Sequence, residues 1–185
     1  MFAIMPPEEV AVIIHNERLI FAERYNCVKA LKPPIHITIY PPFEEKETIE
    51  KEMMSLDAWA AMQSPFSVAL KDYSFFKTRF SPVIYIDVEQ NPVLQKLRSE
   101  FVSRLRKYIT VSTDFGPYQP HFTIGYRDVP AAKLPQIKEE YSVRKFNAAF
   151  EVKSIFFWKY VNNHWQTIHE FRFSGADKVP SSPST

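Results

Sequence analysis

The sequence predicts a duplicated α+β fold: two pseudo-twofold-related lobes, each with an antiparallel-rich sheet backed by helices, and a central cleft between the lobes. Three observations lead to this prediction. First, His36-Ile37-Thr38-Ile39 is repeated as His121-Phe122-Thr123-Ile124, and a proline lies just ahead of each copy. Second, the segments around both copies follow one order: strand, helix, motif strand, helix, strand. Third, helices connect the strands within each unit, as in layered α+β architectures.

The spacing of equivalent segments supports the duplication. The opening strands start at Phe2 and Val83, the motif histidines are His36 and His121, and the following strands start at Phe66 and Phe146, so the offsets are 81, 85 and 80 residues. At 185 residues, the chain can bury a core without disulfides or metals. We expect one bilobal domain over residues 1–175, with repeats over about 1–80 and 81–175, and a disordered tail over 176–185.

The first half begins with a short apolar strand at residues 2–5 and a helix that runs to about residue 25. Pro7-Glu8-Glu9 marks the helix start, because proline fits the first turn and acidic residues favour a helix N-terminus. The helical spacing predicts that its buried residues are Val10, Ile13, Ile14, Phe21 and Ala22 and that its solvent-facing residues are Glu17, Arg18, Glu23 and Arg24.

Prolines separate the remaining elements of the first half. A β-branched, alternating stretch at 35–40 lies between Pro33-Pro34 and Pro41-Pro42 and predicts the strand of the first motif. A helix is predicted over 47–63, and a strand over 66–77 follows Pro65. The apolar face of that helix comprises Ile49, Met53, Leu56 and Ala60.

The second half opens with a strand at 83–88, after a turn at 78–82. Asn91-Pro92 predicts a helix start with asparagine as cap, and a loop at 110–120 leads into the second motif strand at 121–127. A weaker helix is predicted near 131–141, with Pro135 in its first turn or interrupting it. Strands over 146–160 and 165–173 form a predicted hairpin around Asn162-Asn163. The buried stripe of the helix after Asn91 comprises Leu94, Leu97, Phe101, Leu105 and Tyr108.

The repeated motif has a chemistry that follows from strand geometry. Alternate side chains of a strand share a face, so His36 and Thr38 point one way and His121 and Thr123 do the same in the second copy. A cleft with two such pairs offers one imidazole to take a proton and another to give one. Threonine hydroxyls can donate to phosphate oxygens as charge builds, so the motifs favour metal-free phosphodiester cleavage.

Two such motifs half a chain apart, in a small duplicated α+β protein, resemble the 2H phosphoesterase superfamily, also called the 2′-5′ RNA ligase-like or LigT-like family. The resemblance covers about residues 1–173 and is closest to small bacterial members without an assigned substrate. It implies a metal-independent enzyme without cofactors, acting on 2′,3′-cyclic phosphates or 2′-5′ linkages of nucleotides or RNA ends. It further implies that His36 and His121 are the acid/base pair and that Thr38 and Thr123 contact the phosphate. Hydrolase and ligase directions both stay open.

Residues beside the motifs are candidates for substrate binding. Tyr40 and Tyr126 could stack on a base, with core packing as the alternative, and Arg127 could bind a phosphate or an RNA tail, with a solvated surface position as the alternative. Further candidates of these two kinds, near the turn between the repeats, are Phe76, Phe80, Lys77 and Arg79.

Composition excludes several other classes. Cys27 is the only cysteine, so an intrachain disulfide and a multi-cysteine zinc site are excluded, and we expect a cytoplasmic protein. The net charge of +2 is far from that of a duplex-DNA-binding protein, and no apolar run approaches membrane-spanning length. The oligomeric state stays open.

Two alternative functions remain. The same cleft could bind a nucleotide or RNA without turnover, and a metal-dependent hydrolase would need more carboxylates near the histidines than the sequence offers. The histidines outside the repeat, which we expect to be surface or packing residues, are His15, His164 and His169.

Overall fold

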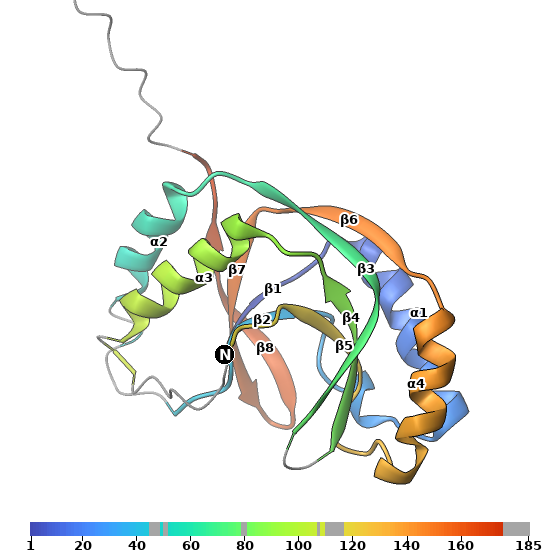
Figure 1. The fold of residues 1–185 in the computed structure, drawn as a ribbon. Coiled ribbons are helices and arrows are strands. Elements are labelled where there is room, and N and C mark those ends of the chain that lie inside the picture. Colours follow the sequence, from blue (N-terminus) through green and yellow to red (C-terminus); the bar gives the residue numbers. More distant parts are fainter. Residues whose placement is uncertain (45–48, 50–51, 79–80, 107, 110–116, 176–185) are drawn as a thin grey trace, which may run out of the picture.

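The computed structural model describes residues 1–44, 49, 52–78, 81–106, 108–109 and 117–175 (Figure 1). The chain forms two four-stranded antiparallel sheets with α-helices on the outside, so the predicted α+β class is confirmed. Several sequence predictions fall outside the described residues: Phe80 and Arg79, most of the loop at 110–120, part of the helix start at 47–51, and the tail at 176–185.

The first sheet has the strand order β2-β1-β7-β8 and the second has the order β5-β4-β3-β6. The strands of the first sheet are β1 (Phe2–Ile4), β2 (Ile37–Tyr40), β7 (Ser154–Val161) and β8 (His164–Arg172). The strands of the second are β3 (Phe66–Lys77), β4 (Pro82–Val88), β5 (His121–Gly125) and β6 (Asn147–Val152).

The predicted strand over 146–160 is divided at Lys153 into β6 and β7, which belong to different sheets. Here the prediction was wrong, because alternation of side chains shows where an extended segment is buried but not which partner it pairs with. The predicted hairpin of β7 and β8 is confirmed, and both Asn162 and Asn163 have the positive φ angles, 49° and 65°, of its turn.

The duplication is visible in the register of the strand pairs. Ala3 pairs with Thr38 in the first sheet, and Tyr85 pairs with Thr123 in the second. In both pairs the register shifts at the next step, which gives a bulge at the same place in both motif strands. Strands β2 and β5 are therefore structural equivalents, each at one edge of its sheet.

Each sheet nevertheless combines strands from both halves of the sequence. Strand β3, from the first half, pairs with β4 and β6 of the second half. Strand β7, from the second half, pairs with β1 of the first. The two lobes are thus joined by exchanged strands rather than built each from its own repeat.

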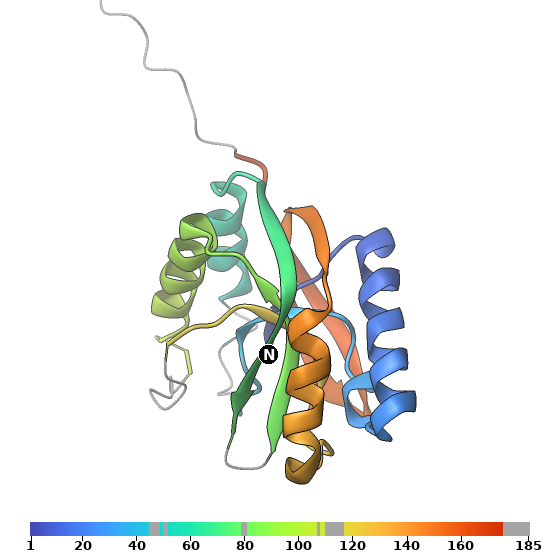
Figure 2. The same cartoon turned by 45° about the vertical axis from the view of Figure 1, so that its right-hand side comes forward.

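The helices cover the outer faces of the sheets in two pairs (Figures 1 and 2). Helices α2 and α3 pack on the first sheet, against β8 and β2, and helices α1 and α4 pack on the second, against β5 and β3. None of the helices in the described ranges is both long and apolar enough to cross a membrane. The helix bounds are α1 (Glu8–Tyr25), α2 (Met53–Ala61), α3 (Pro92–Leu105) and α4 (Leu134–Val143), with 3₁₀ turns at Lys29–Leu31 and Ala131–Lys133.

Sequence signals located the helix starts well. The Asn91 side chain accepts a hydrogen bond from the Leu94 amide at 3.0 Å, so the predicted cap of α3 is confirmed. Pro135 lies in the first turn of α4, which was one of its two predicted positions. Of the predicted helix over 47–63, the described part is helical at Met53–Ala61, and residues 47, 48, 50 and 51 lie outside the described residues.

Helix α1 differs from the prediction in which side chains it buries. Arg18 was expected in solvent but is only 1% exposed, whereas Ile13 was expected in the core but is 49% exposed. The helix is apolar on both sides, so periodicity alone did not identify its inner face. Arg18 follows the buried Val10 and Ile14 at four-residue steps and so shares their face.

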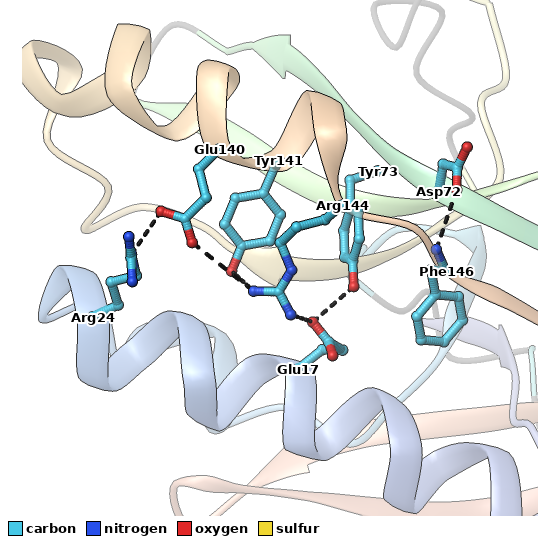
Figure 3. A network of polar contacts seen from close by, with 8 residues as sticks. All are labelled: Glu17, Arg24, Asp72, Tyr73, Glu140, Tyr141, Arg144 and Phe146. Atoms are coloured by element: carbon cyan, nitrogen blue, oxygen red, sulfur yellow. Dashed lines mark hydrogen bonds and ion pairs between the residues drawn. The ribbon is translucent and has the colours of Figure 1, made fainter.

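Two contacts fix α1 on the second sheet. The Phe21 ring occupies the space above Gly125, where a Cβ atom would lie 2.5 Å from the ring, so only glycine lets the helix approach β5 this closely. A polar network links α1 to α4 and β3, with Glu17 of α1 at its centre (Figure 3).

Candidate active site

The two motif strands, β2 and β5, contact each other where the sheets meet. Along both strands apolar and polar residues alternate as the sequence predicts. The polar members His36, Thr38, His121 and Thr123 are all half-buried, whereas their neighbours Ile37, Ile39, Phe122 and Ile124 are at most 1% exposed. The apolar residues anchor each strand in the core, and the His-Thr pairs lie on the opposite face.

Both imidazole rings are held by the same backbone contact. Nδ1 of His36 lies 2.8 Å from the carbonyl oxygen of Pro34, and Nδ1 of His121 lies 2.7 Å from that of Gln119. A carbonyl oxygen only accepts, so Nδ1 carries the proton and donates it in both rings. Nε2 of each neutral ring is therefore the basic atom, with a lone pair for proton transfer.

Aromatic rings hold both imidazoles from the side. The ring of Trp158 meets that of His36 at a centroid distance of 5.4 Å and an angle of 73°. Phe76 meets His121 at 5.3 Å and 78°, and Tyr85 adds a contact to His121 at 4.8 Å. Trp158 and Phe76 lie on the equivalent strands β7 and β3, so the two environments share this feature.

Burial favours the neutral form of both histidines, but the charges near the two rings differ. Burial lowers the pKa of His36 to about 4; the Pro34 carbonyl acts to raise it, and the positive charge of Arg18 and the proximity of His121 lower it further. Burial also lowers the pKa of His121, whereas the Gln119 carbonyl and the Asp87 carboxylate act to raise it. His36 thus has a cation nearby and His121 an anion.

The surroundings of Asp87 explain its influence on His121. The two residues are register partners on β4 and β5. The Gln119 side chain donates a hydrogen bond to Oδ1 of Asp87 at 2.8 Å, and the Gln119 main chain accepts from His121. A short network therefore connects the carboxylate to the imidazole through one residue.

The three candidates beside the motifs have different positions. Tyr40 is 2% exposed and packs against Phe43 in the core, with a ring centroid distance of 5.7 Å, so its ring offers no exposed face for a base. Tyr126 is half-buried and Arg127 exposed. These two bind each other, since Arg127 Nε donates to the Tyr126 hydroxyl at 2.6 Å and the guanidinium lies 4.9 Å above the Tyr126 ring.

Sequence reasoning missed several residues of this site. Arg18 was predicted to face solvent, and Tyr85, Asp87 and Trp158 were not singled out. The signal for Gln119 was available, because it precedes His121 by two residues as Pro34 precedes His36. In the described ranges, no group of three or more His, Cys, Asp and Glu side chains is placed to hold a metal ion.

Comparison with known proteins identifies the family of this chain. Residues 6–164 match the model of the 2′-5′ RNA ligase superfamily. Two Geobacillus proteins, both named "Putative phosphoesterase", are similar over most of their length. The protein of Geobacillus kaustophilus is 30% identical over 186 residues, covering 95% of this chain and 96% of the relative. That of Geobacillus thermodenitrificans is 31% identical over 169 residues, covering 86% and 89%.

Solved structures share the fold. TT0787 of Thermus thermophilus superposes with a TM-score of 0.63 at 19% identity, over 95% of this chain and 97% of that one. LigT of Escherichia coli, in its complex with 3′-AMP, superposes with a TM-score of 0.64 at 18% identity, over 94% and 96%. The chain therefore belongs to the 2′-5′ RNA ligase superfamily of 2H phosphoesterases, and it is an enzyme of the phosphoesterase type.

Proposed function

We propose that the protein is a metal-independent phosphoesterase that acts on 2′,3′-cyclic phosphate or 2′-5′ phosphodiester linkages of nucleotides or RNA ends. The observation that carries this proposal is the matched anchoring of His36 and His121. Both donate through Nδ1 to a carbonyl two residues earlier, which leaves both Nε2 atoms for proton transfer. Thr38 and Thr123, on the same faces, supply hydroxyl donors for the phosphate.

Opening of a 2′,3′-cyclic phosphate uses both imidazoles. One neutral ring accepts a proton from water at Nε2 while the water oxygen forms a bond to phosphorus. The bond from phosphorus to one ribose oxygen breaks, and the other ring, protonated, gives its proton to that leaving oxygen. With a ribose hydroxyl in place of water, the same pair performs transfer at a 2′-5′ linkage.

The charges around the rings favour one assignment of roles. His36 is the general base, because burial and Arg18 keep it neutral and able to accept a proton. His121 is the general acid, because the Asp87 carboxylate favours its protonated form.

A nucleotide is the best-supported class of substrate. The titles of three LigT structures name 3′-AMP, NADP⁺ and ATP as the bound molecules. In this chain Phe156 pairs with Ala3, and Ala3 pairs with Thr38, so these three side chains share one face of the first sheet. The half-buried Phe156 ring lies in the same row as the threonine and offers a surface for base stacking.

The test is turnover of 2′,3′-cyclic nucleotides and a 2′-5′ dinucleotide in the presence of a chelator. We expect product with the wild type and a loss of about 10²–10⁴-fold in kcat for His36→Ala and for His121→Ala. His15→Ala, a change of an exposed histidine on α1, serves as the matched control and should retain full activity.

Two outcomes would contradict the proposal. Activity that survives the double His→Ala substitution would exclude the acid/base pair, and activity lost in chelator would point to a metal-dependent hydrolase. Tight nucleotide or RNA binding without product would instead assign the alternative function, a non-catalytic binding module that uses the same cleft.

A further inference from the structure

Helices α1 and α3 each carry an arginine followed three residues later by a phenylalanine, at equivalent positions of the two repeats. Arg18 and Phe21 of α1 correspond to Arg98 and Phe101 of α3, and the members of both pairs are 80 residues apart in the sequence. Both phenylalanines are fully buried. The helices therefore present an arginine and a phenylalanine, three positions apart, toward their sheets.

Both helices pack on the motif strand from the opposite half of the chain. Helix α1, from the first half, lies against β5, and helix α3, from the second half, lies against β2. The arginines can therefore reach the main chain of the opposite motif.

Arg18 bonds to both motif segments at once. Its Nε donates to the carbonyl oxygen of Thr123, within the second motif, at 2.8 Å. Its Nη1 donates to the carbonyl oxygen of Pro33, three residues ahead of His36, also at 2.8 Å. One guanidinium thus ties β5 to the segment that leads into the first motif.

Arg98 makes the reciprocal connection. Its Nε donates to the carbonyl oxygen of Ile39, within the first motif strand, at 3.5 Å. Its guanidinium carbon lies 4.7 Å from the centre of the Tyr118 ring. Tyr118 lies three residues ahead of His121, as Pro33 does for His36.

The residues that the two arginines contact ahead of each motif are direct neighbours of the residues whose carbonyls bind the imidazoles. Pro33 directly precedes Pro34, whose carbonyl accepts from His36, and Tyr118 directly precedes Gln119, whose carbonyl accepts from His121. We infer that Arg18 and Arg98 are a reciprocal pair of positioning residues, which set the spacing and orientation of the two histidines by holding each motif strand from the opposite half. This inference rests on the proposed function of the cleft.

The burial of Arg18 argues against a purely stabilising role. Arg18 is 1% exposed, its Nη2 atom is buried without a hydrogen-bond partner, and burial lowers its pKa to about 10, so it remains charged at neutral pH. A buried charge costs desolvation energy, and an apolar side chain of similar size is often as stable or more so. An apolar side chain could fill this space, but it could not donate hydrogen bonds to two carbonyls at once, as the guanidinium does.

The experiment compares Arg18→Met and Arg98→Met with Arg104→Met, which changes an exposed arginine on α3 as the matched control. The substrate is 2′,3′-cyclic AMP, and denaturant unfolding is measured in parallel. We expect kcat to fall by about 10²-fold in each test variant, because small displacements of reacting groups are costly. KM should change little, because the proposed role places neither arginine on the substrate, and Arg104→Met should match the wild type.

A pH profile separates positioning from a general loss of structure. The charges that face His36 are those of Arg18, His121 and the Met1 amino group. Arg18→Met should therefore move the acidic limb of kcat/KM to higher pH, whereas Arg98→Met should leave it in place. Arg18→Lys keeps the charge but not the fork, so it should restore the acidic limb without restoring kcat.

These experiments distinguish a failure of the positioning role from a failure of the proposed phosphoesterase activity. A wild type without turnover would overturn the proposed function, while NMR titration of His36 in Arg18→Met would still show whether the arginine acts on the ring. Should Arg98→Met fold and keep kcat within twofold of the wild type, the paired role is wrong. An unshifted His36 titration in Arg18→Met would likewise contradict the contact with the first motif.

Discussion

At the scale of single residues, the site contains two histidines with one backbone geometry and two electrostatic environments. The carbonyl contacts of Nδ1 are nearly the same, at 2.8 and 2.7 Å. The neighbouring charges differ, with Arg18 acting on His36 and Asp87 on His121. Duplication thus provides two equivalent imidazoles, and residues outside the motif place different charges beside them, which fits the proposed division into one base and one acid.

Replacement of Asp87 by asparagine tests the proposed roles of His36 as base and His121 as acid. Burial lowers the pKa of His121 and the Asp87 carboxylate offsets part of that lowering, so Asp87→Asn should lower the pKa further and reduce the protonated fraction of His121. As the general acid must be protonated, the basic limb of the kcat profile should move to lower pH, with the acidic limb unchanged. NMR titration of His121 together with the pH profile measures both effects.

Glu89→Gln is the control, because Glu89 is also a carboxylate at the end of this sheet but pairs with the exposed Lys71. A basic limb that moves equally in both variants, or not at all in Asp87→Asn, would contradict the assignment of His121 as the acid.

At the scale of elements, buried tyrosines and ion pairs link α1 to α4 and to β3 (Figure 3). Glu17 of α1 accepts from Arg144 at 2.8 Å and from the Tyr73 hydroxyl at 2.7 Å. At the other end, Glu140 accepts from Arg24 and from the Tyr25 hydroxyl, both at 2.6 Å. Because α1 also carries Arg18, we expect the network to help hold this helix in place beside β5.

Arg144→Met should weaken this connection measurably. The substitution leaves Glu17 half-buried without its cation and removes the guanidinium from the faces of Tyr73 and Tyr141. The loss of a charged hydrogen bond at such a site costs about 1–3 kcal/mol of unfolding free energy. Denaturant unfolding at pH 7 is the measurement.

The neighbouring residue offers the control. The Lys145 side chain is 78% exposed and pairs with Asp72, so Lys145→Met should change stability by less than about 1 kcal/mol. Equal midpoints for the two variants would show that the network adds no more than a surface ion pair.

The same helices show what the sequence could predict about elements. The starts of α1, α3 and α4 followed from caps, prolines and periodicity, which are local signals. The burial of Arg18 did not follow, because its inward position is stabilised by the carbonyls of Thr123 and Pro33, both distant from α1 in sequence. An arginine in a helix with apolar residues on all sides gives no local sign of such partners.

At the scale of the whole molecule, the repeat predicted the paired motif strands but not the sheets that contain them. The repeat spacing brought His36 and His121 into one proposed cleft, and the register of β1 with β2 matches that of β4 with β5. The exchange of β3 and β7 was missed, because periodicity identifies buried faces whereas partner choice depends on long-range packing. Tyr40 illustrates the same limit, since its place in the core depends on Phe43 and on the sheet around it.

The strand exchange makes a prediction about the folding of the two halves. In a fragment of residues 1–80, β3 lacks both of its partners, β4 and β6, and β1 lacks β7. In a fragment of residues 81–175, the hairpin of β7 and β8 lacks the strands that join it to its sheet. We therefore expect each fragment alone to be unfolded or aggregated, since isolated strands with unpaired edges are unstable.

Mixing of the two fragments should restore the native structure, because together they contain every strand pair. Circular dichroism and thermal unfolding are the measurements, and the full chain, with one cooperative transition, is the reference. A fragment that folds by itself with a sharp transition would show that a repeat is an independent unit. Recovery of turnover on mixing, together with folding, would show that the two histidines become a working pair only when the halves exchange strands.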